Sequence, residues 1–156
     1  GGIHYRVGGV DKPSALRSVV EVLPLPEEVD REFLLQVLLA RESVGSTAIG
    51  DGIAIPHVRN PITLHVAQPI VALSFLENDI DFQAIDGRPV HTLFTIISPT
   101  IRAHLNLLSK LAYGLKGSPF AEAVAGRASR EEIFQAATQL DAQIETMAGQ
   151  AEGSPA

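Results

Sequence analysis

Several residue types are absent or scarce in this chain of 156 residues. It has no cysteine and no tryptophan, and aromatic residues make up only 5% of it. Without cysteine it forms neither disulfides nor thiolate metal sites, and a reducing cytoplasm is its simplest location. No apolar run approaches the roughly 20 residues of a transmembrane helix, and the start does not resemble a signal peptide, so membrane insertion is not expected.

Positive charge is also scarce. The chain has 12 Lys and Arg against 18 Asp and Glu, which gives a net charge of −6, and its basic residues form no cluster. Nucleic-acid binding by this domain is therefore not expected, whereas a basic protein partner is permitted. The content of 46% hydrophobic and 19% charged residues is typical of a globular protein.

The length fits one domain with a real core. We expect this domain to span residues 1–147 and the small, polar tail 148–156 to be disordered. The chain opens with two glycines rather than methionine, as a piece of a longer protein or a tag remnant does.

Hydrophobic periodicity predicts an α/β fold. Strands are expected at 3–7, 52–57, 66–75 and 90–97, and helices at 12–23, 31–42, 99–116, 120–125 and 130–147. The buried stripe of the second helix is predicted to comprise Phe33, Leu34, Val37 and Leu38, and that of the long helix after Pro99 to include Ile101, Leu105, Leu108 and Leu111. Residues 78–79 are expected in a loop and residues 86–87 in a turn. Because the elements alternate without a strict βαβ rhythm, they indicate a mixed β-sheet with α-helices on its faces.

The stretch Gly45–His57 is the best candidate for chemistry. Its first eight positions hold three glycines together with Ser46 and Thr47, and successive exposed backbone N–H groups form an anion-binding concavity. An apolar run then ends at Pro56–His57. A neutral imidazole is a good nucleophile near pH 7 and can hold a phosphoryl group as a phosphoramidate. The alternative is that His57 is a structural polar residue at a strand end.

Two further residues are candidates for the same site. His104 falls on or beside the buried stripe of its helix, so it is either a core histidine or a hydrogen-bond donor to a phosphoryl oxygen opposite His57. Arg41 stands where a helix gives way to the loop, and its planar fork either pairs with phosphate oxygens or complements the helix dipole. The other three histidines, His4, His65 and His91, are expected to be structural.

Other kinds of site find no support. The sequence has no Walker A motif and no Gly-x-Ser-x-Gly elbow, and Gly50–Gly52 precedes a strand rather than opening a helix, unlike a dinucleotide fingerprint. The histidines do not stand at metal-ligand spacing. No cofactor and no metal are expected.

These residues carry a family resemblance. The segment Arg41–His57, supported by Ile80–Val90 and by His104–Leu111, resembles the IIA domain of the fructose/mannitol class of the bacterial phosphoenolpyruvate-dependent phosphotransferase system, in its nitrogen-regulatory branch. The likeness runs from about residue 3 to 147. It implies the fold of mannitol IIA, a mixed β-sheet sandwiched by α-helices.

The resemblance also implies roles. His57 is the position that accepts a phosphoryl group from an HPr/NPr-like histidine phosphocarrier, His104 lines its pocket and Arg41 neutralises phosphate charge. Ser46 and Thr47 fall where the family shapes the phosphoryl pocket. The family commonly has glycine at the positions of Ala48 and of the residue after the active histidine, where this chain has Val58 followed by Arg59. These two residues are expected at the rim of the site, where they either narrow the access to His57 or add a positive charge, and this departure bears on the choice of partner.

Three functions remain open at this point. The leading one is a regulatory, phosphoryl-accepting IIA domain whose state is read by a partner protein. The second is a sugar-transport IIA that passes phosphate to a IIB subunit. The third is an interaction module of the same fold that is not phosphorylated.

Overall fold

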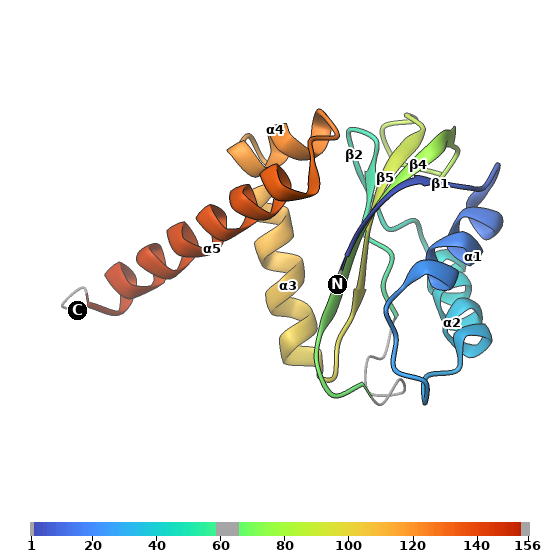
Figure 1. Ribbon diagram of the computed structural model, residues 1–156, viewed down its shortest axis with the longest axis horizontal. Coiled ribbons are helices and arrows are strands. Elements are labelled where there is room, and N and C mark those ends of the chain that lie inside the picture. The colour runs from blue at the N-terminus through green and yellow to red at the C-terminus, as the bar shows by residue number, and fades with distance from the viewer. Residues whose placement is uncertain (1, 59–65, 154–156) are drawn as a thin grey trace. The chain divides into compact units, whose positions relative to one another are not determined.

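The strands of this chain form one mixed sheet in the computed structural model, which describes residues 2–58 and 66–153, without the side chains of 148–153 (Figure 1). The strands are β1 (Ile3–Val7), β2 (Ala48–Gly50), β3 (Ile53–Ala54), β4 (Ile70–Ile80) and β5 (Val90–Ile97). Their order in the sheet is β1-β4-β5-β3-β2. β1 is parallel to β4 and β3 is parallel to β5, while the β4–β5 and β2–β3 pairs are antiparallel. The predicted fold class, a mixed sheet with helices, is confirmed.

The centre of the sheet is the long β4–β5 pair. β5 was predicted at its observed bounds, because it is the chain's richest run of β-branched and aromatic residues. β4 begins at Ile70 rather than near Val66, and it runs through residues 78–79, which were expected in a loop. That expectation was wrong because Ile80 pairs with Val90 and extends the ladder across this polar segment.

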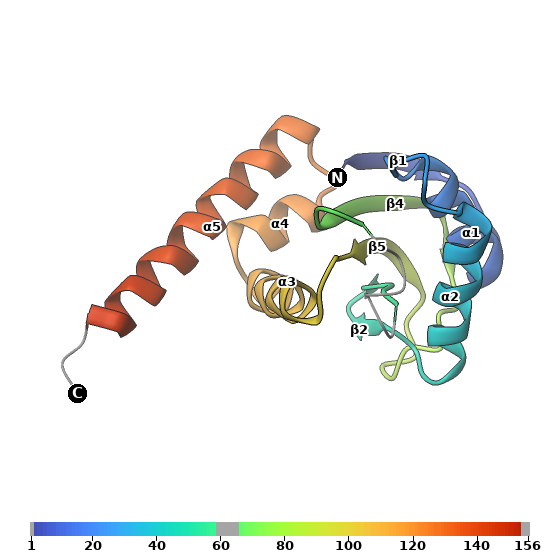
Figure 2. The ribbon, with the colours of Figure 1, turned by 90° about the horizontal axis from the view of Figure 1, so that it is seen from below.

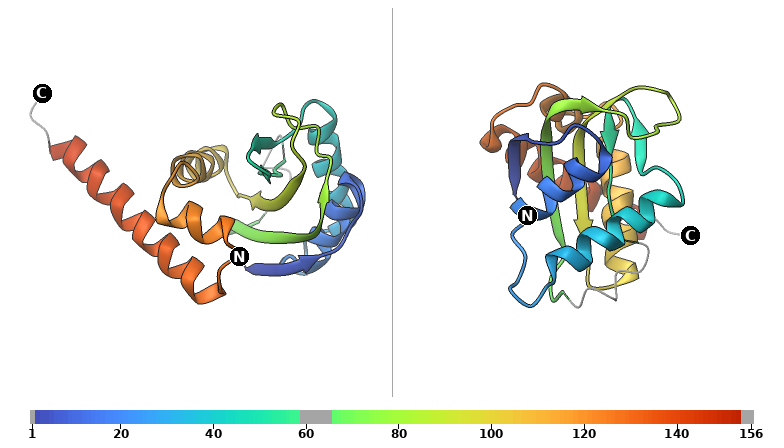
Figure 3. Two further views of the ribbon diagram at one scale, coloured as in Figure 1. Left: turned by 90° about the horizontal axis from the view of Figure 1, so that it is seen from above. Right: turned by 90° about the vertical axis from the view of Figure 1, so that its right-hand side faces the viewer.

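Helices α1 (Lys12–Val22) and α2 (Arg31–Ser43) pack against each other and cover one face of the sheet, as the right-hand view of Figure 3 shows. Asp11 and Asp30 cap their N-termini by accepting backbone N–H groups. Leu34 and Leu38 of α2 enter the core as predicted, but Phe33 is 48% exposed and Leu35 is buried in its place. The apolar stripe is therefore rotated slightly from the predicted one.

The helix α3 (Ile101–Gly114) runs from the sheet-bearing unit, which ends at Leu105, into a second compact unit. In that second unit the later turns of α3 are joined by α4 (Pro119–Ala125) and α5 (Arg130–Gly153), the last two lying side by side (Figure 2). A Cβ at Gly114 would stand 2.4 Å from Leu140 Cδ2, so this glycine permits the close packing of α3 on α5.

Two expectations about the C-terminal helices were inaccurate. Ile101 and Leu105 are half-exposed, whereas Leu111 is buried as predicted. α5 continues to Gly153, beyond the predicted end near Met147, so part of the expected tail is helical, and residues 154–156 lie outside the described residues. The assignment of 1–147 to a single domain stays a prediction. Among the helices that the structure describes, none is long and apolar enough to cross a membrane.

Candidate functional site

The stretch Gly45–His57 folds as a tight hairpin after α2. β2 and β3 are joined through Gly50, Asp51 and Gly52, all of which have positive φ (100°, 55° and 80°). The carbonyl of Gly52 accepts hydrogen bonds from the backbone N–H groups of His91 and Thr92, which fixes the hairpin on β5. β2 was not predicted, because three residues ending in glycine carry no readable strand pattern.

His57 follows β3 and is attached to the sheet through β5. Its backbone forms a parallel bridge with Ile96 of β5, and the carbonyl of Pro56 accepts the Ile96 N–H at 3.0 Å. Its Nδ1 lies 2.7 Å from the carbonyl oxygen of Ile55. Since a carbonyl oxygen only accepts, Nδ1 carries the proton in this contact and Nε2 keeps its lone pair.

His104, at the start of α3, lies against His57. The two ring centroids are 4.9 Å apart, with the ring planes inclined at 50°. His104 is only 7% exposed, and its Nδ1 is buried without a hydrogen-bond partner among the described residues. The two histidines that the sequence predicted to face each other are in contact, and one polar atom of the pair has no hydrogen bond among the described residues.

Burial lowers the pKa of both histidines. For His57 desolvation is the largest cause, the charge of Arg41 acts in the same direction, and the Ile55 carbonyl and the charge of Glu42 oppose it. For His104 the causes are desolvation and the neighbouring His57. Both imidazoles are therefore neutral at pH 7, the state in which a ring nitrogen is nucleophilic.

Arg41 stands in the last turn of α2, beside the loop. Its Nη1 donates to the carbonyl of Gly45 at 2.7 Å, and its side chain is only partly buried. The guanidinium is near enough for its charge to depress the pKa of His57. It therefore places a cation at the C-terminal end of α2, close to the histidine pair. Its pairing with phosphate oxygens stays a prediction.

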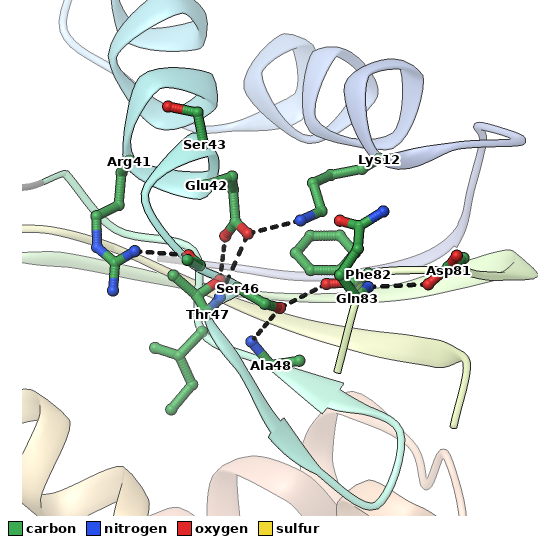
Figure 4. A network of polar contacts seen from close by, with 12 residues as sticks. Lys12, Arg41, Glu42, Ser43, Ser46, Thr47, Ala48, Asp81, Phe82 and Gln83 are labelled. Carbon is green, nitrogen blue, oxygen red and sulfur yellow. Dashed lines mark hydrogen bonds and ion pairs between the residues drawn. The ribbon is translucent and has the colours of Figure 1, made fainter. Parts of the chain in front are cut away.

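The loop hydroxyls are engaged in protein contacts (Figure 4). The hydroxyl of Ser46 donates to the carbonyl of Phe82 and accepts the N–H of Ala48 at 3.1 Å. The hydroxyl of Thr47 donates to the carboxylate of Glu42, and the Thr47 N–H approaches the same carboxylate at 3.3 Å. In this arrangement both side chains hold the shape of the loop.

A buried carboxylate beneath the loop was missed by sequence reasoning. Glu42 is 7% exposed and pairs with Lys12 Nζ of α1 at 3.0 Å. The signal was present in the sequence, because Glu42 continues the four-residue spacing of Leu34 and Leu38 on the buried face of α2. The charge of Glu42 reaches His57 and raises its pKa.

The remaining histidines lie elsewhere. His91 packs against Gly52, and its Nδ1 lies 2.7 Å from Thr92 Oγ1, which agrees with a structural role. His4 lies in β1, and His65 and Arg59 lie outside the described residues. Within the part of the chain that the structure describes, no three His, Asp or Glu side chains could together hold a metal ion.

The position after His57 also differs from expectation. Val58 is 1% exposed and belongs to the hydrophobic core shared by the sheet, α1 and α2. It therefore does not narrow the access to His57 from the rim, as an exposed residue at this position would.

Comparison with known proteins identifies the family of this chain. The family described as "Phosphoenolpyruvate-dependent sugar phosphotransferase system, EIIA 2" matches residues 3–139. The chain is 34% identical over 133 residues to a nitrogen regulatory protein of Pseudomonas aeruginosa, covering 83% of this chain and 84% of that protein. It is 33% identical over 113 residues to a fructose-specific EIIABC component of Bacillus subtilis, covering 70% of this chain but 17% of that protein.

A solved structure gives the same result. The crystal structure of the nitrogen regulatory protein IIA-Ntr from Neisseria meningitidis superposes with a TM-score of 0.75 and 28% sequence identity, over 86% of this chain and 92% of that one. Sequence, fold and residue pattern thus agree over most of the length. The chain belongs to the EIIA type 2 family of the phosphoenolpyruvate-dependent sugar phosphotransferase system.

Proposed function

We propose that this chain accepts a phosphoryl group on Nε2 of His57 from an HPr/NPr-like histidine phosphocarrier and acts as a regulatory IIA protein. The observation that carries the proposal is the 2.7 Å contact between His57 Nδ1 and the Ile55 carbonyl. It selects the tautomer whose Nε2 lone pair is free to attack phosphorus. A phosphocarrier of this kind works in the cytoplasm, so the proposal places the chain there.

The transfer balances without a cofactor. The Nε2 lone pair forms a bond to phosphorus as the bond between phosphorus and the carrier's imidazole breaks. The carrier's ring nitrogen takes the bonding electrons, and with a proton on its other nitrogen it departs as neutral imidazole. The proton stays on His57 Nδ1, where it is donated in a hydrogen bond to the Ile55 carbonyl, and the phosphoryl oxygens keep their charge.

His104 and Arg41 are suited to stabilising that charge. The unpartnered, buried Nδ1 of His104 lies in a ring whose centroid is 4.9 Å from that of His57. As its N–H tautomer it would donate to a phosphoryl oxygen. Arg41, whose charge already acts on His57, would attract the anion and orient the donor for in-line transfer.

A regulatory role is favoured by the relatives that match most of this chain's length. The nitrogen regulatory protein of Pseudomonas aeruginosa is covered over 84% of its length, whereas the fructose-specific EIIABC component of Bacillus subtilis is covered over 17% of its length. Phosphorylation adds about −1.5 to −2 charges at pH 7, enough to recruit or reject a protein partner. Two alternatives remain, namely a transport IIA that transfers its phosphoryl group to a IIB subunit and an interaction module that is not phosphorylated. The two experiments below distinguish them from this proposal.

The test is phosphorylation with defined components. The chain is incubated with labelled phosphoenolpyruvate, the first enzyme of the system and an HPr-like carrier, and acid-labile, base-stable label is measured. We expect one phosphoryl group per wild-type chain, none on His57→Ala, and slower labelling of His104→Ala. His91→Ala, a histidine outside the pair, serves as the matched control and should be labelled like wild type. Unlabelled wild type, or full label on His57→Ala, would refute the proposal.

A second measurement separates regulation from transport. Labelled protein is mixed with sugar-specific IIB subunits, and the rate of label loss is compared with spontaneous hydrolysis. A regulatory protein should retain its label in the presence of these subunits. Rapid discharge to a IIB subunit would establish the transport alternative instead.

A further inference from the structure

The buried ion pair between Lys12 and Glu42 has no role in the chemistry described so far. The side chains of Lys12 and Glu42 are 12% and 3% exposed, and their charged atoms lie 3.0 Å apart. Lys12 Nζ also stands 4.7 Å from the centre of the Phe82 ring. Buried ion pairs are often no more stabilising than apolar residues of the same volume, so stability alone does not account for this pair.

Glu42 joins the pair to the loop. Its carboxylate accepts the Lys12 ammonium, the Thr47 hydroxyl and, at 3.3 Å, the Thr47 N–H (Figure 4). Three parts of the chain therefore meet on one carboxylate, namely α1, the end of α2 and the loop that leads into β2. All of these contacts are buried or part-buried, where a hydrogen bond to a charged group is strong.

From Thr47 the connection continues to the histidine. The carbonyl of Thr47 accepts the N–H of Ile55 at 3.0 Å, across the β2–β3 hairpin. The carbonyl of the same Ile55 holds His57 Nδ1 at 2.7 Å. Glu42 thus holds the hydroxyl and the N–H of Thr47. The carbonyl of Thr47 in turn holds Ile55, the residue whose own carbonyl orients the imidazole of His57.

We propose that the Lys12–Glu42 ion pair positions His57: by holding Thr47 it fixes the Ile55 carbonyl, which sets the ring orientation and the tautomer. Lys12 and Glu42 act as positioning residues, since they reach the imidazole only through the loop backbone. The consequence for phosphoryl transfer rests on the proposed function, whereas the consequence for the tautomer does not.

The charges around His57 fit this arrangement. Arg41 and Glu42 are neighbours at the end of α2, and their charges shift the pKa of His57 in opposite directions. From α3 the ring meets His104, whose own pKa is lowered by burial and by His57. Lys12 balances the carboxylate from α1, so that Glu42 holds the loop without leaving an unpaired charge beneath it.

The test uses the full chain with Glu42→Gln and reads the tautomer directly. In wild type, ¹⁵N chemical shifts of the His57 ring should show a protonated Nδ1 and an unprotonated Nε2. In Glu42→Gln we expect both shifts to move toward the average of two exchanging tautomers. Labelling by the phosphocarrier should slow by about ten- to a hundredfold, the range typical of a displaced reacting group. Lys12→Met should act in the same direction.

Matched controls separate positioning from general destabilisation. Glu32→Gln removes the exposed partner of Arg17, another ion pair between α1 and α2, and should leave both the tautomer and the labelling rate unchanged. Leu34→Ala makes a cavity in the buried face of α2 and should lower the melting temperature without altering the His57 shifts. Thr47→Val removes only the hydroxyl contact with Glu42 and should shift the His57 signals less than Glu42→Gln does. It keeps the test open if Glu42→Gln does not fold.

The outcomes are distinct. Unchanged His57 shifts in folded Glu42→Gln and Thr47→Val would overturn the positioning role, as would equal slowing of labelling in Leu34→Ala. A wild-type ring that already exchanges between tautomers would also overturn it. Failure of the wild-type chain to be labelled, with the shifts responding as expected, would refute the proposed function and leave the positioning of His57 established.

Discussion

Replacing Gly52 with alanine should strain the hairpin that leads to His57. Gly52 has φ of +80°, and a Cβ added there would stand 2.3 Å from His91 Nε2. An L-residue in the left-handed region costs about 1–2 kcal/mol. The His91 ring must also swing away, losing its contact with Thr92 Oγ1, which adds about 1 kcal/mol for a hydrogen bond and a similar amount for a distorted rotamer. We therefore expect a loss of about 3–4 kcal/mol in the free energy of unfolding.

The chain offers a matched control for the backbone part of this cost. Gly87 has a similar φ of +72°, but a Cβ there would meet nothing within 4 Å. Gly87→Ala should therefore cost only the conformational term of about 1–2 kcal/mol. In a His91→Ala background the ring is gone, so Gly52→Ala should cost no more than Gly87→Ala does.

The assay is urea unfolding followed by the NMR intensities of backbone amides in β4 and β5, which report on the sheet alone. The free energies of the wild type, of Gly52→Ala and His91→Ala, and of their double variant form a cycle that isolates the contact between position 52 and His91. Equal costs for Gly52→Ala and Gly87→Ala in the wild-type background would refute the reasoning. So would a difference that persists after His91 is removed.

Three further predictions follow from the site and the second unit. Burial lowers the pKa of His57 and His104 below the ordinary 6.5, so the unfolded chain binds more protons than the folded one below that pH. The free energy of unfolding should therefore be highest above about pH 6.5 and fall as the pH drops below it. Urea unfolding from about pH 7.5 to 5 should show a weaker pH dependence of this free energy in the double variant His57→Gln, His104→Gln. Arg41→Gln removes a charge that depresses the pKa of His57, so NMR titration should show a higher pKa, whereas the exposed Arg17→Gln should leave it unchanged. Ser118→Ala removes the N-cap of α4, which should cost about 1 kcal/mol in urea unfolding followed at the α4 amides; no change would show that the cap contributes nothing.

The architecture was largely predictable because strong periodic signals carry it. β1, β5, α1 and α2 appear where alternation, helical spacing and capping aspartates place them. The errors occurred where tertiary contacts override local patterns. Ile80 pairs with Val90, so a polar segment that was expected in a loop belongs to β4. Phe33 is half-exposed, although its helical spacing predicted that it would be buried.

At the candidate site, the sequence supplied the residue types and the structure supplied their contacts. Prediction named His57, His104 and Arg41, and the structure brings the two rings into contact and the guanidinium within electrostatic reach. It also moved Val58 from the expected rim into the core. Whether these residues carry the phosphoryl group stays a prediction.

By itself, the sequence determined where a reactive site is to be expected, because a glycine-rich loop ending in Pro56–His57 favours a nucleophilic imidazole beside an anion site. The missing cysteines exclude thiolate chemistry. Only the tertiary structure decided how that imidazole is held. The Ile55 carbonyl that orients it lies two residues away, but the group that secures the loop, Glu42 with Lys12, comes from α2 and α1. A spacing of 30 residues between Lys12 and Glu42 leaves no local pattern, since such a contact arises only when two helices pack on the same sheet.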